Sequence, residues 1–199
     1  KYLGVEPVAI NSSLVSAQNR YRLYWANWDI TQPDDKGIVL KDILVEGYGD
    51  SVADQGTTVK QTNVDKAACL LARDYKGFGN QAMTGVRTCE LREYDKDEEC
   101  HHVGTALDIN GHDILKRVYS DTGKSPTLNT MGGGNREPKV LTSVDKGTYR
   151  PLLPIEMERL QTLPDNYTDG VSNTQRKKML GNGWTVDVIV HILKQGGFV

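Results

Sequence analysis

Residues 150–164 read Arg-Pro-Leu-Leu-Pro-Ile-Glu-Met-Glu-Arg-Leu-Gln-Thr-Leu-Pro and carry the strongest local structural signal in the chain. Pro154 suits the first turn of a helix, where its missing N–H sacrifices no hydrogen bond. Glu156, Met157 and Leu160 follow at helical spacing, and Pro164 ends the run. We therefore expect a short helix that begins at Pro154 and ends before Pro164.

Two more helices are expected after this segment. Asn173 is suited to cap a helix over residues 174–180, and Gly181 is suited to end it. The last helix is expected to bury apolar residues at i, i+3, i+4 and i+7, namely Val186, Ile189, Val190 and Leu193. Such a stripe needs a partner surface, and the first two strands of the chain can supply one.

The residues before position 150 have the pattern of strands and loops. Residues 7–15 are predicted to form a buried strand and residues 22–28 an aromatic-rich one, with a polar turn between them. Residues 29–146 are rich in Gly, Thr, Asp and Asn, which indicates loops and short strands. Residues 66–72 and 124–130 share the pattern Lys, small, any residue, Cys or Thr, Leu, any residue, small. This similarity fits either two similar strand-to-loop units or chance.

Composition sets broad limits on the class of protein. Of the 199 residues 38% are hydrophobic and 25% charged, and no apolar run approaches the roughly 20 residues that a membrane span needs. Three cysteines, at positions 69, 89 and 100, favour a reducing compartment over a disulfide framework, so we expect a cytoplasmic protein. The first residue is Lys1 and leads directly into a strand-like pattern, which suggests a segment of a longer protein.

The charge distribution is more informative than the net charge. A net charge of −2 gives no overall argument for nucleic-acid binding. Residues 114–139, however, contain five basic side chains against two acidic ones. This local surplus fits either a phosphate-binding surface or an ordinary solvated surface of mixed charge.

A pair of arginines stands at the mouth of the second expected strand. Residues 18–22 read Gln-Asn-Arg-Tyr-Arg. In an extended segment Arg20 and Arg22 point the same way, so their guanidinium groups can converge on one phosphate or carboxylate. The same spacing also fits a surface ion-pair site.

Three segments of the chain together resemble one enzyme family. Residues 150–164 are similar to the ninth conserved motif of the DNA cytosine-5 methyltransferases, R-x-L-T/S-P-x-E-x-x-R-L-Q-x-F/L-P. Residues 180–188, Leu-Gly-Asn-Gly-Trp-Thr-Val-Asp-Val, resemble the tenth motif, and residues 18–22 resemble the eighth. The order and spacing of the motifs extend the resemblance over essentially the whole chain. Residues 8–28 and 116–139 look similar to the phage and prophage members of the family.

The resemblance implies roles in substrate binding and places the chemistry outside this chain. In the family the eighth-motif arginines reach a flipped cytosine and its phosphate, so Arg20 and Arg22 are expected to contact the substrate, with Gln18 supporting them. The family attacks C6 of the cytosine with a thiolate from a Pro-Cys motif, and none of the three cysteines here follows a proline. We expect an amino-terminal catalytic half, in the same polypeptide or in a separate subunit, and an inactive chain without it.

The resemblance also implies a cofactor site. The tenth motif closes over S-adenosyl-L-methionine, which assigns Asn182, Gly183 and Trp184 to cofactor binding. Gly183 stands where serine is commoner, so at this position only the backbone is left to bond the cofactor. The ninth motif is chiefly structural, and Glu156 and Arg159, three residues apart on one helix, are expected to pair or to brace the joint with the recognition domain.

Double-stranded DNA is the implied partner, and the region between the eighth and ninth motifs has the position of a target-recognition domain. The Thr127-Leu128 pair, which that domain is expected to contain, and the glycine-rich residues 131–135 are expected to approach the bases. The candidate phosphate and second-loop contacts are Lys124, Arg136, Lys139, Arg73 and Lys76. Each glycine in residues 131–135 also fits a simple structural role in a hairpin turn.

The expected fold is α/β, the carboxy-terminal part of a Rossmann-like methyltransferase domain with an inserted recognition domain. Residues 1–45 are expected to end the catalytic domain. Residues 46–146 are expected to form a small, mainly β and irregular recognition domain, and residues 147–199 to return to the catalytic domain.

Two other classes of protein are considered. One is a DNA-binding protein or subunit that has no catalysis of its own. The other is a zinc-binding module built from Cys89, Cys100, His101, His102 and His112. Adjacent histidines and the lack of a Cys-x-x-Cys pair make that spacing unlike the usual structural zinc sites.

Overall fold

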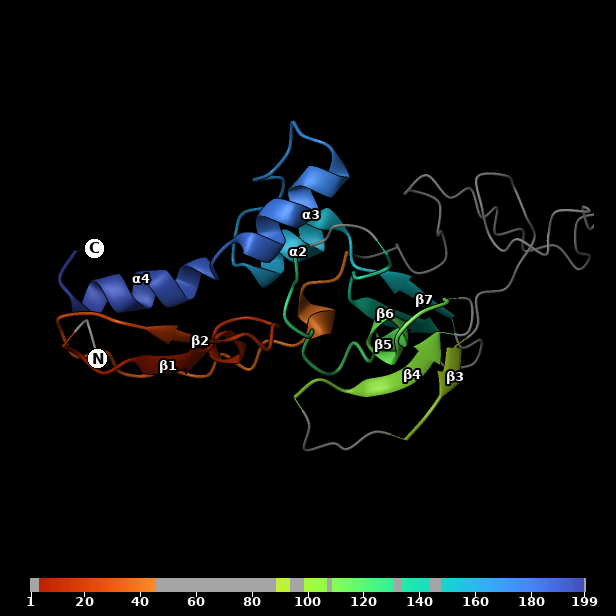
Figure 1. Ribbon diagram of the computed structural model, residues 1–199, viewed down its shortest axis with the longest axis horizontal. Helices are drawn as coiled ribbons and strands as arrows, with labels where there is room; N and C mark the ends of the chain where they lie inside the picture. Colours follow the sequence, from red (N-terminus) through yellow and green to blue (C-terminus); the bar gives the residue numbers. More distant parts are fainter. Residues whose placement is uncertain are drawn as a thin grey trace, which may run out of the picture.

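The computed structural model describes residues 4–45, 89–93, 99–106, 109–130, 134–143 and 148–198. Two sheets and several short helices lie along one long axis (Figure 1). A two-stranded sheet and the last helix occupy one end, a five-stranded sheet lies toward the other, and two helices lie between them. The strands are β1 (Val8–Asn11), β2 (Tyr21–Tyr24), β3 (Cys89–Leu91), β4 (His102–Ala106), β5 (Arg117–Tyr119), β6 (Lys139–Ser143) and β7 (Thr148–Pro151). The α-helices are α1 (Asp113–Lys116), α2 (Pro154–Leu160), α3 (Asn173–Asn182) and α4 (Val186–Gln195), and 3-10 turns span Ser12–Leu14 and Leu40–Asp42.

The first strand is shorter than the sequence predicted. β1 ends at Asn11, whose side-chain oxygen accepts hydrogen bonds from the backbone N–H of Ser13 (3.2 Å) and Arg20 (2.9 Å). These bonds turn the chain into a 3-10 helix, so the predicted strand over residues 7–15 is wrong beyond Asn11. β2 likewise covers only the first part of the predicted strand over residues 22–28.

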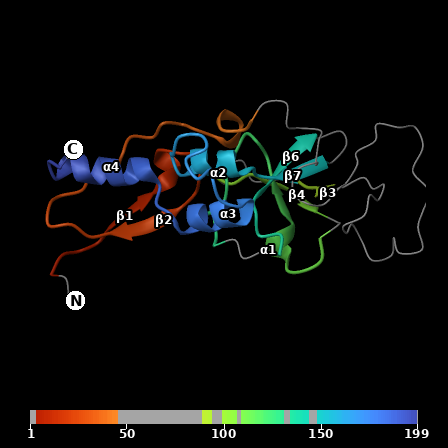
Figure 2. The same ribbon diagram turned by 90° about the horizontal axis from the view of Figure 1, so that it is seen from above.

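The last helix packs on this hairpin, as expected, but through a different face. Val188 and Ile192 of α4 are buried against Ile10 and Val15, whereas the four predicted stripe residues are only half-buried. Six of the ten residues of α4 are apolar and they do not lie on a single narrow stripe, so spacing alone could not select the buried face. The indole N–H of Trp28 donates to the carbonyl of Ile192 at 3.1 Å. Figure 2 shows α4 at the same end of the molecule as β1 and β2.

The five-stranded sheet has the order β3-β4-β5-β6-β7. All neighbours pair antiparallel except β5 and β6, which are parallel. β6 and β7 pair antiparallel, from Lys139↔Pro151 to Ser143↔Thr148, so the sheet contains strands from both sides of the domain boundary expected between residues 146 and 147.

One central core joins residues from all three expected domains. It contains Ala17, Leu40 and Ile43 from the first segment, Tyr119, Leu128 and Val140 from the middle, and Leu152, Met157, Leu160 and Leu180 from the last. In the part of the chain that the structure describes, residues from the three segments therefore share one hydrophobic core.

The helix at residues 150–164 is confirmed and the cap of the next helix is corrected. α2 begins at Pro154, as predicted. α3 is capped by Ser172, whose hydroxyl accepts from the N–H of Gln175, and not by Asn173. Gly181 does not end α3, which continues to Asn182. The missing side chain of Gly181 instead allows the helix to pack closely on the backbone of Asn129.

The combination of sheets and helices confirms an α/β protein in the coarse sense expected. Among the described residues, no helix has both the length and the apolar character required to cross a bilayer.

Candidate functional site

Arg20 lies between the polar turn after β1 and strand β2, and its side chain joins three distant segments. Its Nη1 donates to the carbonyl of Leu128 at 3.1 Å. Its Nη2 donates to the carbonyls of Gly181 at 3.3 Å and Gly183 at 2.9 Å. Only 7% of Arg20 is exposed. Burial lowers the pKa of its guanidinium, and the positive charge of Arg22 lowers that pKa further.

Backbone contacts reinforce the same junction. Asn19 N donates to the carbonyl of Ser125 at 2.9 Å, Ser125 N donates to Ala17 at 2.7 Å, and Gln18 forms a parallel bridge with Ser125. The hydroxyl of Thr127 donates to the carbonyl of Asn19 at 2.6 Å. Residues 17–20 and residues 125–128 therefore lie side by side, although more than 100 positions separate them in the sequence.

The segment of residues 127–130 also contacts residues 181–184, which are the last two residues of α3 and the two residues after it and are called the 181–184 loop below. Thr130 donates a hydrogen bond through its hydroxyl to the side-chain oxygen of Asn182. A Cβ atom added to Gly181 would lie 1.9 Å from the carbonyl oxygen of Asn129. Asn129, Thr130 and Asn182 are exposed, so the two segments present polar side chains next to the residues whose carbonyls accept hydrogen bonds from the buried Arg20.

The eighth-motif arginines occupy different environments. Arg22 is exposed and its Nη1 donates to the carbonyl of Tyr21 at 2.7 Å. Arg20 is enclosed and its two terminal nitrogens serve backbone carbonyls. The two side chains therefore do not form the open anion fork that their spacing suggested.

Gln18, the third predicted member, is completely buried. Within the described residues, neither the oxygen nor the nitrogen of its side-chain amide has a hydrogen-bond partner. A buried amide without partners costs free energy, so the polar atoms of Gln18 do not stabilise this junction.

The predicted DNA contacts differ in what they can reach. Leu128 is 1% exposed in the central core, so the expectation that it approaches a base is corrected, and the hydroxyl of Thr127 is already bonded to Asn19. The Lys124 ammonium donates to the carbonyls of Ser13 (2.8 Å) and Ile38 (2.5 Å).

The remaining basic candidates also fall into two groups. Lys139 is 5% exposed and donates to the carbonyls of Asn135 (2.8 Å) and Glu137 (3.0 Å), so its charge holds a turn. Arg136 is exposed. Arg73, Lys76 and the echo at residues 66–72 lie outside the described residues.

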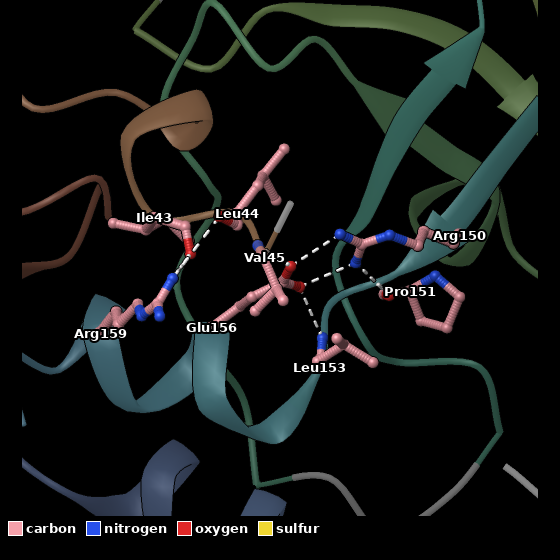
Figure 3. A network of polar contacts seen from close by, with 8 residues as sticks. All are labelled: Ile43, Leu44, Val45, Arg150, Pro151, Leu153, Glu156 and Arg159. Carbon is pink, nitrogen blue, oxygen red and sulfur yellow. Dashed lines mark hydrogen bonds and ion pairs between the residues drawn. The ribbon is translucent and has the colours of Figure 1, made fainter. Parts of the chain in front are cut away.

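The ninth-motif residues Glu156 and Arg159 do not pair with each other but brace the same chain segment (Figure 3). The Glu156 carboxylate receives Nη1 and Nη2 of Arg150 at 2.8 and 2.6 Å and the N–H of Val45 at 2.9 Å. Arg159 donates to the carbonyl of Ile43 at 2.9 Å and pairs with Asp165 at 2.6 Å. Both residues thus hold residues 43–45.

Sequence reasoning did not identify Glu158 and Gln161, two further buried polar residues of this motif. Glu158 pairs with Arg176 at 2.8 Å. Burial acts to raise the pKa of Glu158, but hydrogen bonds from Thr168 and Arg176 outweigh burial and lower this pKa below its ordinary value. Gln161 donates to the carbonyl of Leu180 at 2.6 Å and so supports the end of α3. Polar residues inside an amphipathic pattern were the available signal, but their partners lie up to 24 positions away.

The zinc-binding alternative gains no support from the described part of the chain. There, no three His, Cys, Asp or Glu side chains are grouped so that they could hold a metal ion. His102 instead accepts a hydrogen bond from Arg92 at Nδ1 (3.1 Å) and donates from Nε2 to the carbonyl of Gly104 (2.9 Å). The side chain of Cys89 lies outside the described part.

Comparison with known proteins gives a family and several relatives. The family model described as C-5 cytosine-specific DNA methylase matches residues 14–197. The orphan methyltransferase M.SPBetaI of Bacillus phage SPbeta is 33% identical over 138 residues, covering 45% of this chain and 31% of the relative. The orphan methyltransferase M.Rho11sI of Bacillus phage rho11s is 65% identical over 34 residues, covering 17% of this chain and 7% of the relative.

A third relative comes from a cellular organism. The type II methyltransferase M.Sau3AI of Staphylococcus aureus is 45% identical over 49 residues, covering 25% of this chain and 12% of the relative. The chain thus spans no more than about a third of the length of these relatives.

Proposed function

The chain belongs to the C-5 cytosine-specific DNA methylase family, and we propose that it forms the part of a DNA cytosine-5 methyltransferase that holds the DNA target and completes the S-adenosyl-L-methionine site. The observation that supports this proposal best is the convergence at Arg20. This one side chain contacts the 127–130 segment, which belongs to the candidate recognition region, and the 181–184 loop, which resembles the cofactor-binding motif.

Arg22 and Arg136 are the exposed cations proposed to hold phosphates. Both are exposed, so binding of a phosphate would break no buried contact. Thr130 and Asn129 are also exposed. In this proposal these two polar residues, rather than the buried Leu128, approach a base. In this proposal residues 46–146 act as the recognition region inserted between the two catalytic segments.

Asn182, Gly183 and Trp184 fit the proposed cofactor role in their chemistry. Trp184 is 69% exposed, so its indole can contact a planar adenine ring, and the exposed amide of Asn182 offers polar groups. A Cβ added to Gly183 would lie 3.2 Å from the carbonyl oxygen of Met179, so any side chain at this position would crowd the end of α3. The cofactor, when bound, supplies the methyl group.

The nucleophile is proposed to come from outside these 199 residues. The reaction needs a thiolate that adds to C6 of the cytosine, so that C5 can accept the methyl group and then lose its proton as the thiol leaves. Cys69, Cys89 and Cys100 follow Ala68, Thr88 and Glu99 rather than proline. The proposed partners are therefore an amino-terminal catalytic half and double-stranded DNA, and the cytoplasmic location stays a prediction.

A comparison of the 199-residue chain with the protein extended upstream in its own reading frame tests this proposal. We expect radiolabelled methyl transfer to cytosine from the extended protein only, and DNA binding by both. Methyl transfer by the isolated chain at the rate of the extended protein would disprove the missing nucleophile. DNA binding with no transfer by the extended protein would favour the alternative of a DNA-binding protein without catalysis.

A further inference from the structure

The Arg20 side chain has the contacts of a tether. Its guanidinium is buried and each terminal nitrogen donates to a backbone carbonyl, at Leu128 on one side and at Gly181 and Gly183 on the other. For Arg20 to bind a substrate with these nitrogens, three carbonyls would have to lose a charged donor inside the protein. Loss of such bonds is costly because the buried acceptors cannot recover water.

The two segments that Arg20 joins also contact each other. Thr130 donates to Asn182, and the backbone of Asn129 lies so close to Gly181 that only glycine fits there. Asn129, Thr130, Asn182 and Trp184 are exposed, and each of them is a sequence neighbour of a residue whose carbonyl accepts from Arg20 or lies within two positions of one. A displacement of one segment must therefore strain the other.

We propose that Arg20 is a positioning residue that holds the 127–130 segment and the 181–184 loop as one unit, so that DNA and cofactor affinity depend on it together. This inference rests on the proposed function of the two segments. It assigns substrate contact to the exposed Arg22 and assigns Arg20 to the alignment of the surfaces that bind DNA and cofactor.

Hydrogen exchange of the 199-residue chain, followed by mass spectrometry, tests the tether without any activity. In Arg20→Met we expect amides in residues 127–130 and 181–184 to exchange on the order of tenfold faster, because charge-assisted hydrogen bonds are lost. Arg150→Met is the matched control, since it also removes a buried guanidinium but one that serves Glu156. It should affect residues near 45 and 153 and spare the two segments.

Arg20→Lys keeps the inference testable if Arg20→Met does not fold. A lysine ammonium can hold several carbonyls, as Lys124 does, but it is shorter than arginine, so partial protection is expected. Unchanged exchange in both segments in either folded variant would overturn the tether.

Binding measurements on the extended protein test the consequence. Arg20→Met should raise the dissociation constants for S-adenosyl-L-methionine and for DNA together, each on the order of tenfold. Adding Thr130→Val should then weaken binding less than it does in the wild-type background, because both changes release the same junction. Weaker DNA binding alone, with unchanged exchange, would assign Arg20 to direct substrate contact. If the wild-type protein binds neither ligand, the proposed function fails while hydrogen exchange still decides whether Arg20 is a tether.

Discussion

Gly181 in α3 packs directly on the backbone of Asn129: a Cβ at position 181 would lie 1.9 Å from the Asn129 oxygen and 2.5 Å from its carbonyl carbon. Real atoms cannot approach so closely, so any side chain must separate the helix from the 127–130 segment. The glycine therefore sets the distance between two parts of the site.

Gly181→Ala is expected to destabilise the protein although alanine favours helices. The helical gain of about 1 kcal/mol is smaller than the strain, so we expect the free energy of unfolding to fall by about 1–3 kcal/mol. Urea denaturation measures this change. Thr174→Ala, at an exposed position of the same helix, is the control and should stay within about 0.5 kcal/mol of wild type. A Gly181→Ala protein as stable as this control would contradict the close approach.

The buried pair of Arg150 and Glu156 should matter far more than the exposed pair of Arg159 and Asp165. Glu156→Ala leaves the Arg150 guanidinium buried without its carboxylate and should cost about 3–5 kcal/mol. Asp165→Ala removes a pair that solvent screens and should cost about 1 kcal/mol or less. Denaturant midpoints of the two variants give the comparison, and equal losses would refute the distinction.

Replacement of the buried Gln18 amide should stabilise the fold and impair function. Gln18→Met keeps the approximate shape and removes two polar atoms without partners, so we expect a gain of about 1–3 kcal/mol in unfolding free energy. Gln161→Met is the matched control: Gln161 is equally buried, but its amide bonds Leu180 and Thr185, so this variant should be destabilised. We also expect methyl transfer by the extended Gln18→Met protein to fall. A melting temperature for Gln18→Met below that of wild type would rule out the stabilisation.

His102 should make stability depend on pH in the mildly acidic range. Burial lowers its pKa most, the positive charges of Arg92 and Arg117 lower it further, and the bond to Gly104 opposes them. The native state therefore binds fewer protons than the unfolded chain. The stability that the neutral His102 contributes is complete above about pH 6.5, the ordinary pKa of histidine, and is lost as the pH falls below that value toward the lowered native pKa. Thermal melting between pH 5 and pH 8 should show a shallower slope for His102→Asn than for wild type. Identical slopes for the wild type and His102→Asn would contradict the prediction.

The sequence alone determined the family and the local elements within its motifs. Proline at the first turn places the start of α2 at Pro154, and the ordered motifs identify the methyltransferase resemblance that the family match confirms. These signals are local, since caps, periodicity and motif order depend on residues a few positions apart.

The tertiary structure alone decided what the polar residues do. Arg20 and Lys124 carry the charged donors that phosphate ligands need, yet these donors bond to carbonyls that lie up to 163 positions away in the sequence. The buried face of α4 and the role of Gly181 were also set by partners distant in sequence. A side chain buried among unpaired carbonyls must satisfy them, and only the folded chain brings those carbonyls within reach.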